Sequence, residues 1–255
     1  MDKWNWKAII LLALGSVLAQ AIAPANAETP KPPSLTVGAI PFIGGDKARI
    51  DAIKRLPGSD ISIVESAGST FFLSSNGRYA LRGEAWDLWN AKPIRSVTEA
   101  TSVAGHIDLN RMGLKIADLT HFDYGTGKRD VVIFLDPRCP HCKATIKQMA
   151  ALSGDYRFRI VPVPVLGKES QALMKHMGCV PASGRDKVTK ALLDDAYDTL
   201  PAEDPNCDLA PLQRVLVTAQ IIGIRGVPYL IAPYGRISEG EPSGGLKAWL
   251  EQSGD

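Results

Sequence analysis

The chain has 255 residues, with 29 Lys plus Arg, 27 Asp plus Glu, and four cysteines. A net charge of +2 without a long basic run argues against nucleic acid as a partner. With 45% hydrophobic and 22% charged residues, the composition excludes a disordered chain and a polytopic membrane protein. Four cysteines are too few to build a disulfide scaffold of this size.

The first 27 residues predict a secretory signal peptide. Two lysines precede an apolar run over residues 8–19, and Ala25 and Ala27 are the small residues expected before a cleavage site. We expect cleavage after Ala27 and export to a compartment where cysteines can be oxidised. The alternative is a retained membrane anchor, for which the apolar run is short.

Residues 28–94 predict a small α+β domain. A mostly helical spacing of apolar residues predicts a helix over residues 46–56, stopped by a Pro-Gly pair. Alternation over residues 61–65 predicts a half-buried strand, and Asn76 and Gly77 between two apolar runs predict a β-hairpin. Such a domain has little apolar surface to bury and would be marginally stable alone.

A linker with helix signals follows over residues 95–121. Ser96 and Glu99 have the spacing of a capping box, which favours a helix start at this point. Gly105 and Gly113 lower the helix propensity, so we expect a broken or bent linker helix.

Residues 122–255 predict an α/β domain. The continuous apolar run over residues 130–135 is typical of a buried parallel strand. A helix, a second strand, a mostly helical block over residues 167–223, a strand pair and a final helix are expected after it.

The motif that carries chemistry is Cys139-Pro140-His141-Cys142, which follows the buried strand and opens a helix. Two residues between the cysteines place both sulfurs on one helical turn. The unpaired N–H groups at the helix N-terminus favour a thiolate on Cys139. Arg138 and protonated His141 add positive charge, so both are expected to lower the thiol pKa further. This arrangement predicts a redox-active pair.

Cysteine pairs with this spacing also occur in zinc sites and in haem attachment sites. A structural zinc site needs a second close Cys or His pair, and a haem attachment site needs His at position 143, where this chain has Lys. A purely structural bridge between the two cysteines remains an alternative. We expect no metal and no cofactor.

The other two cysteines flank the helical block. Cys179 and Cys207 lack a helix-start context, so we interpret them as a structural disulfide in an exported chain, with a second redox pair as the alternative. Val227-Pro228 begins the late strand, where the residues alone indicate a turn proline.

Residues 134–143, Phe-Leu-Asp-Pro-Arg-Cys-Pro-His-Cys-Lys, resemble the active-site segment of the periplasmic thiol:disulfide interchange proteins of the DsbC/DsbG family. Residues 76–83 and 86–88 are similar to the N-terminal dimerisation domain of that family. The resemblance covers nearly the whole chain after residue 27.

The resemblance implies a periplasmic homodimer with a cystatin-like dimerisation domain, a helical linker and a thioredoxin-like catalytic domain carrying a helical insertion. It implies Cys139 and Cys142 as catalytic residues, and Cys179–Cys207 as the structural disulfide of the insertion. It also implies a cis peptide bond before Pro228, with Val227 and Pro228 binding substrate. The implied partners are misfolded exported proteins with cysteines and a membrane thiol reductase of the DsbD type.

Three positions depart from the family pattern. Pro140-His141 is the dipeptide of the oxidase DsbA, and Val227 stands where DsbC and DsbG have Thr. Ile133 occupies the place of the buried acid of thioredoxin and DsbA, which matches the DsbC type. The expected function is disulfide isomerisation or reduction through a Cys139 thiolate; the alternatives are a DsbA-like dithiol oxidase and a disulfide-independent holdase chaperone.

Overall fold

The structure is a computed structural model that describes residues 50–252. The expected signal peptide over residues 1–27 and the first part of the expected dimerisation domain, residues 28–49, lie outside the described residues. Across residues 50–252, no helix combines the length and the apolar character needed to span a membrane.

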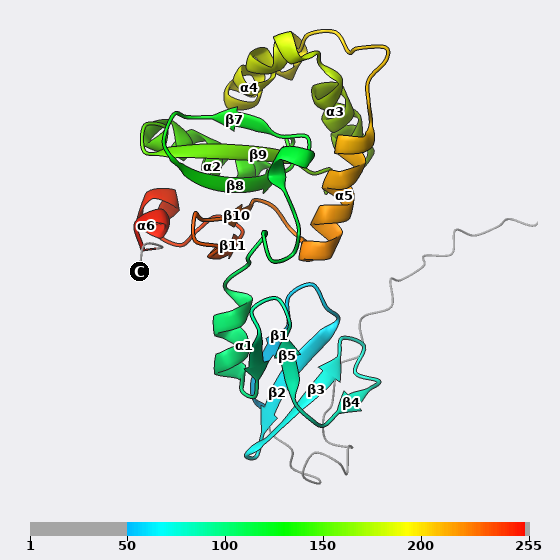
Figure 1. Ribbon diagram of the computed structural model, residues 1–255, viewed down its shortest axis with the longest axis vertical. Helices are drawn as coiled ribbons and strands as arrows, with labels where there is room; N and C mark the ends of the chain where they lie inside the picture. Colours follow the sequence, from blue (N-terminus) through cyan, green and yellow to red (C-terminus); the bar gives the residue numbers. More distant parts are fainter. Residues whose placement is uncertain (1–49, 253–255) are drawn as a thin grey trace, which may run out of the picture. The chain divides into compact units, whose positions relative to one another are not determined.

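Residues 50–104 form an α+β module (Figure 1). Four antiparallel strands pair in the order β1-β2-β3-β4, and two further strands, β5 and β6, form a separate ribbon. Apolar side chains from strands β2, β3 and β6 pack with Ala100 of the single helix, α1. The elements are β1 (Ile50–Arg55), β2 (Ile61–Ser66), β3 (Ser69–Ser74), β4 (Ala80–Leu81), β5 (Ala85–Asp87), β6 (Lys92–Ile94) and α1 (Val97–Ala104).

The expected helix over residues 46–56 is wrong for the residues described, because Ile50–Arg55 is strand β1. Its backbone pairs antiparallel with β2, from Ile50 opposite Ser66 to Arg55 opposite Ser62. The apolar residues that suggested a buried helix face are not buried, since Ile53 is 53% exposed. Pairing with a neighbouring strand therefore overrode the local helical spacing. The strand over residues 61–65 and the hairpin at Asn76–Gly77 are confirmed.

The linker is less helical than expected. Ser96 is the N-cap of α1 and accepts a hydrogen bond from the Glu99 N–H at 3.0 Å, but the helix ends at Ala104, before Gly105. Beyond it the chain forms turns and one short 3-10 helix, η2 (Ile116–Asp118). The helix start at Ser96 and the break at Gly105 are as expected, but only Val97–Ala104 of residues 95–121 is α-helical. Glycine at position 105 ends the helix, and the Asp108 carboxylate accepts the next free N–H groups in a turn.

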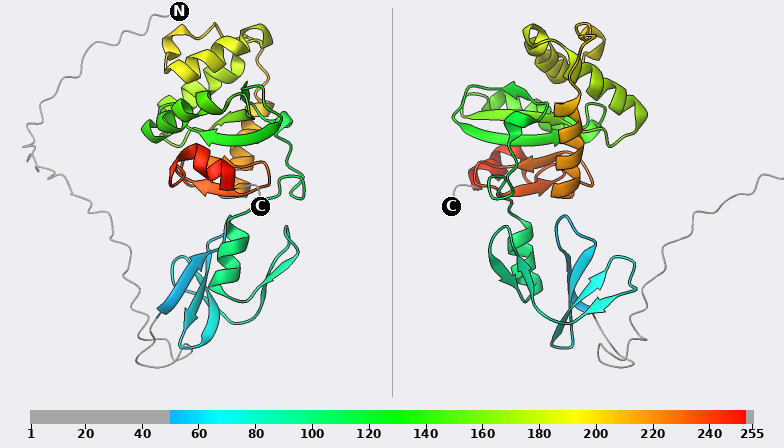
Figure 2. Two further views of the ribbon diagram at one scale, coloured as in Figure 1. Left: turned by 90° about the vertical axis from the view of Figure 1, so that its left-hand side faces the viewer. Right: turned by 45° about the vertical axis from the view of Figure 1, so that its right-hand side comes forward.

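Residues 122–252 form a five-stranded mixed sheet with helices on both faces (Figures 1 and 2). The strands are β7 (Phe122–Tyr124), β8 (Arg129–Leu135), β9 (Tyr156–Pro162), β10 (Tyr229–Ile231) and β11 (Ile237–Glu239). The helices are α2 (Pro140–Met149), α3 (Lys168–Cys179), α4 (Arg185–Asp194), α5 (Ala210–Ile222) and α6 (Gly245–Glu251), with short 3-10 turns η3 (Ala150–Leu152), η4 (Ala182–Gly184) and η5 (Tyr197–Thr199).

The sheet order is β11-β10-β8-β9-β7, and only β8 and β9 run parallel. The prediction of a buried parallel strand over residues 130–135 is confirmed. The short strand β7, antiparallel to β9, was not predicted, because three residues are too few to show an alternating pattern.

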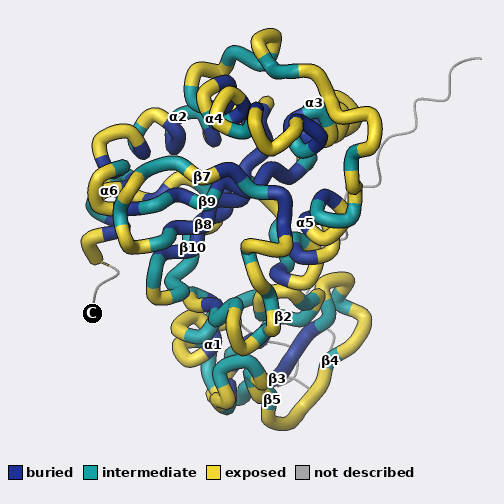
Figure 3. The backbone as a smooth tube through the Cα atoms, turned by 45° about the horizontal axis from the view of Figure 1, so that its top comes forward, coloured by how far each residue is buried: buried dark blue, intermediate teal, exposed yellow. Residues whose placement is uncertain are grey.

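The central strand β8 is buried on both sides, as its unbroken apolar sequence predicts (Figure 3). Ile133 and Leu135 face a core formed with helices α2, α4 and α6. Val132 and Phe134 face a second core with helix α5. Packing on both faces of β8 therefore holds its carboxyl end in place, and the cysteine motif follows directly after that end.

Residues between β9 and β10 include the helices α3, α4 and α5, so the expected helical insertion is present. Helix α4 lies beside the edge strand β7 (Figures 1 and 2). The first residues of the insertion return to the carboxyl end of β8, where the candidate site is built.

Candidate active site

The cysteine motif forms the turn from β8 into α2. Cys139 is the N-cap residue, with extended backbone angles, and Pro140 is the first residue of the helix. Proline suits this position because its missing N–H would have no partner there and its φ angle is already helical. Both Cys142 and Lys143 donate their N–H groups to the Cys139 carbonyl, at 3.1 and 3.3 Å. Both sulfurs therefore belong to the first turn of one helix.

Cys139 lies next to the loop before β10. Its thiol donates to the carbonyl oxygen of Val227, with the two atoms 3.7 Å apart. The Val227–Pro228 peptide bond is cis. The two positions that the resemblance implied as a substrate-binding loop are thus brought to the first cysteine. Only 5% of Cys139 is exposed, so a partner molecule would reach the sulfur across this loop.

Cys142 lies deeper and is 1% exposed. Burial raises the pKa of its thiol well above the ordinary value, because an apolar surrounding disfavours the charged thiolate. The neighbouring Cys139 raises this pKa further, and the charge of the Asp136 carboxylate adds a smaller contribution in the same direction. Both cysteines are free thiols in this structure. Both sulfurs are buried, but their surroundings differ: Cys139 lies at the helix start against the proline loop, and Cys142 lies deeper in the core.

The residues expected to tune Cys139 are at the surface. Pro140 and His141 are exposed, and Arg138 forms an ion pair with Glu169 at 2.6 Å. The Arg138 guanidinium is therefore partly neutralised by a residue of α3. Arg138, Pro140 and His141 therefore all lie at the motif. The Arg138 side chain is paired with Glu169 of the insertion.

Sequence reasoning missed three residues at this site. Asp136 is a fully buried carboxylate at the end of β8. Ser170 on α3 donates its hydroxyl to Asp136 at 2.8 Å, and the hydroxyl of Tyr197 donates to the Pro137 carbonyl at 2.9 Å. A charged residue at the end of an otherwise apolar strand was a visible signal for Asp136. Ser170 and Tyr197 are far along the chain, and their sequence context gave no signal.

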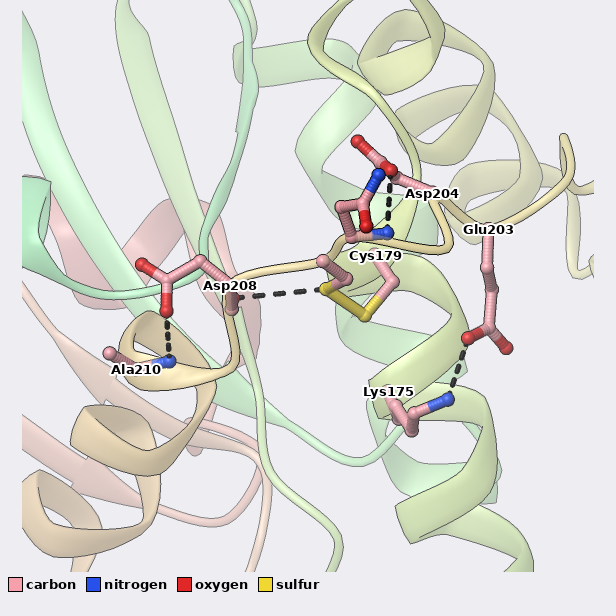
Figure 4. The surroundings of a disulfide bond; sticks show 8 residues. Lys175, Cys179, Glu203, Asp204, Asp208 and Ala210 are labelled. Carbon is pink, nitrogen blue, oxygen red and sulfur yellow. Dashed lines mark hydrogen bonds and ion pairs between the residues drawn. A yellow bond between two sulfur atoms is a disulfide. The ribbon is translucent and has the colours of Figure 1, made fainter.

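The second cysteine pair lies away from the motif, within the insertion (Figure 4). Cys179, the last residue of α3, is bonded to Cys207 with their Cα atoms 5.2 Å apart. An ion pair of Lys175 with Glu203 at 2.7 Å lies beside the bond. The bond joins α3 to the segment that leads into α5, which is the position expected for a structural staple.

Metal ligands are not gathered anywhere in residues 50–252: no group of three or more His, Cys, Asp or Glu side chains is close enough to hold an ion. The site as described consists of two thiols, a buried carboxylate and the proline loop.

Residues 124–253, just over half of the chain, match the thioredoxin-like domain family. The chain belongs to this family. The match begins in β7 and runs through the last helix, so it includes the cysteine motif, the insertion and the proline loop. The thioredoxin-like domain is therefore the part of the chain that holds the site. No curated protein matches the chain.

Three solved structures are similar to the chain at low identity. A disulfide interchange protein from Neisseria gonorrhoeae is 21% identical with a TM-score of 0.44, covering 55% of this chain and 97% of that chain. ScsC of Proteus mirabilis in a transitional conformation is 20% identical with a TM-score of 0.45, covering 54% and 73%. A periplasmic thioredoxin-like protein from Salmonella enterica serovar Typhimurium is 19% identical with a TM-score of 0.42, covering 52% and 88%.

Proposed function

We propose that this protein is a thiol:disulfide oxidoreductase that isomerises or reduces wrong disulfides in exported proteins. The observation that carries the proposal is the position of Cys139. It is the N-cap of α2, its sulfur lies 3.7 Å from the Val227 carbonyl, and the second thiol, Cys142, is buried one turn away. A thiolate at a helix N-terminus is stabilised and is the attacking species in thiol–disulfide exchange.

The first step is attack of the Cys139 thiolate on one sulfur of a substrate disulfide. A mixed disulfide forms between Cys139 and the substrate, and the other substrate sulfur leaves as a thiolate. Backbone groups of Val227 and Pro228 would hold an extended substrate segment beside the sulfur, as in strand addition.

Two routes complete the reaction. In isomerisation, a different substrate thiolate attacks the mixed disulfide, which releases Cys139 as a thiolate and leaves a rearranged substrate disulfide. In reduction, Cys142 loses its proton and attacks Cys139, which releases reduced substrate and leaves a Cys139–Cys142 disulfide. An external thiol reductant must then return two electrons, and a membrane reductase of the DsbD type is the proposed donor.

The proposed setting is the periplasm, with residues 1–27 as the cleaved signal peptide. The proposed assembly is a homodimer through the N-terminal domain, and the proposed clients are unfolded or misfolded proteins with cysteines. Light scattering of the mature chain tests the assembly, since a monomer would contradict it.

A second function is favoured by one specific feature. Pro140 and His141 between the cysteines, together with Val227 before the cis-proline, form the combination that resembles DsbA. Such a protein would keep Cys139–Cys142 oxidised and donate the disulfide to reduced substrates. A reduction potential near the −120 mV typical of DsbA would support this oxidase function.

Refolding of scrambled, fully oxidised ribonuclease separates the two functions. An isomerase restores ribonuclease activity in a redox buffer, whereas an oxidase cannot rearrange existing disulfides. Failure of the wild-type protein to restore activity would contradict the isomerase proposal. The Cys139→Ala variant should no longer restore ribonuclease activity. If it still suppresses aggregation of unfolded clients, that suppression belongs to the holdase function and not to disulfide exchange.

A further inference from the structure

A buried carboxylate lies three residues before the first cysteine, and the exchange reaction does not use it. Asp136 is 0% exposed. Its oxygens accept hydrogen bonds from the Arg138 N–H at 2.9 Å, the Leu166 N–H at 2.9 Å and the Ser170 hydroxyl at 2.8 Å. A buried charge is costly unless it is fully hydrogen-bonded, so three donors on one carboxylate indicate a built arrangement.

The donors come from two different parts of the chain. Arg138 belongs to the turn that carries the cysteines, whereas Leu166 and Ser170 belong to the start of the helical insertion. The Asp136 backbone carbonyl also accepts the Cys139 N–H at 3.0 Å. Asp136 therefore contacts the cysteine turn through both its backbone and its side chain, and the same side chain contacts the insertion.

A second contact from the insertion meets the same turn. The hydroxyl of Tyr197, in η5, donates to the Pro137 carbonyl at 2.9 Å. Asp136 and Pro137, two of the three residues between β8 and Cys139, are thus held by buried or half-buried hydroxyl groups of the insertion. The insertion contributes directly to where Cys139 lies.

The Asp136 charge also acts on the buried sulfur. Burial is the largest cause of the raised pKa of Cys142, followed by Cys139. A hydrogen bond with the Asp136 backbone lowers this pKa, whereas the charge of the Asp136 carboxylate raises it. A negative charge in a poorly solvated region disfavours a nearby thiolate. Other charged groups around the motif are Arg138, which pairs with Glu169, and Lys143, which pairs with Asp195 at 2.5 Å.

We propose that Asp136 is a positioning residue that sets the equilibrium between the dithiol and disulfide forms of Cys139–Cys142, and that Ser170 of the insertion acts on the sulfur pair through it. The inference rests on the proposed function in one respect: the two cysteines must cycle between these forms. Forming the disulfide removes two electrons and two protons from the pair, and glutathione disulfide accepts them to become two glutathione thiols. In the reduced form the thiolate is on Cys139, whose N–H donates to the Asp136 carbonyl at 3.0 Å, because Cys142 keeps its proton. The Asp136 charge opposes that thiolate and so favours the disulfide.

The test is a redox titration of the mature chain in glutathione mixtures, with the dithiol fraction read by alkylation and mass. Asp136→Asn removes the charge and keeps the shape of the side chain. We expect its equilibrium to shift about tenfold toward the dithiol, since one charge at several ångströms has an effect of this order. A tenfold shift corresponds to a potential about 30 mV less negative. An equilibrium within twofold of wild type, or shifted toward the disulfide, would overturn the proposal.

Asp130→Asn is the matched control. Asp130 lies near the start of β8, at the opposite end of the strand from Asp136 and the cysteines, and is paired with Arg157 at 2.7 Å. The same chemical change there should leave the glutathione equilibrium within twofold of wild type. A shift as large as that of Asp136→Asn would show a general effect of charge removal and would also overturn the proposal.

Ser170→Ala tests the role of the insertion. It also tests the proposal by itself if Asp136→Asn does not fold. Loss of the hydroxyl leaves the carboxylate charge less compensated, so the equilibrium should shift about threefold toward the disulfide. In the Asp136→Asn background the same substitution should have no further effect. An unchanged Ser170→Ala equilibrium, or an equal shift in both backgrounds, would contradict the coupling through Asp136.

The two proposals fail in different ways. A wild-type protein that forms no reversible Cys139–Cys142 disulfide would contradict the proposed function. A normal wild-type titration that Asp136→Asn leaves unmoved would contradict only the inference about Asp136.

Discussion

The two cysteine pairs of the thioredoxin-like domain differ in sequence separation, in their surroundings and in their bonding state. Cys139 and Cys142 are separated by two residues, share the first turn of α2 and are free thiols. Cys179 and Cys207 are separated by 28 positions, lie at the end of α3 and in the segment before α5, and are bonded. The first pair depends on local geometry, because a helix start places a sulfur near unpaired N–H groups. The second pair depends on the fold, which brings two distant segments together. The structural surroundings of each pair therefore account for the difference between free thiols and a disulfide.

The largest expected effect is a difference in thiol reactivity between Cys139 and Cys142. At pH 7 iodoacetamide should alkylate Cys139 and leave Cys142 of the folded protein unmodified, with rates that differ by roughly a thousandfold. The reason is that burial raises the pKa of Cys142 and so removes its thiolate, which is the species that iodoacetamide alkylates. Mass spectrometry of peptides after timed alkylation gives both rates.

Denaturant provides the control, since both cysteines should react alike in unfolded protein. Equal alkylation of Cys139 and Cys142 in the folded state would mean that burial does not separate the two thiols.

Removal of the second pair should affect stability and spare reactivity. The double variant Cys179→Ala/Cys207→Ala should lose roughly 3–4 kcal/mol of unfolding free energy on the chain-entropy model for a closed loop of this length. Urea unfolding of the mature chain measures the loss. The alkylation rate of Cys139 should stay within a few-fold of wild type. A variant with unchanged stability but impaired exchange would reverse the duties assigned to the two pairs.

The raised pKa of Cys142 also predicts a pH effect on the reduced protein. An unfolded thiol titrates near pH 8.5, whereas the folded protein keeps this proton to higher pH. The unfolded state therefore loses a proton first, and stability should fall between pH 8.5 and 10 by up to about 1.4 kcal/mol per pH unit. Cys142→Ala should flatten this slope, as measured by urea unfolding at several pH values under reducing conditions. An equal slope in both proteins would exclude the buried thiol as the cause.

The smallest effect is expected at the surface of the motif. Arg138→Met removes an ion pair with Glu169 whose partners are 52% and 75% exposed. Exposed pairs contribute about 0–1 kcal/mol, so the unfolding free energy should change by less than about 1 kcal/mol. Thermal unfolding measures the change, with Lys175→Met, which removes another exposed pair, as the control. A loss of several kcal/mol would show that the arginine has a structural role that its exposure does not indicate.

The sequence was most informative where structure is local. The unbroken apolar run of β8, the capping residue Ser96, the Asn76–Gly77 turn and the start of α2 at the cysteine motif all follow from neighbouring residues. It failed at Ile50–Arg55, where apolar spacing indicated a helix and pairing with β2 made a strand. It also failed for the three-residue strand β7, whose identity depends on its partner β9.

The candidate site likewise has a part that follows from neighbouring residues and a part that depends on distant segments. The position of Cys139 and Cys142 at a helix start after the buried strand was predicted from the sequence alone, because their two-residue spacing is a local feature. Only the tertiary structure decided which distant groups meet this turn: the Val227 carbonyl at the Cys139 thiol, the Ser170 hydroxyl at the Asp136 carboxylate, and the Tyr197 hydroxyl at the Pro137 carbonyl. Hydrogen bonds between segments tens of residues apart depend on how strands and helices pack, and packing is a property of the whole domain.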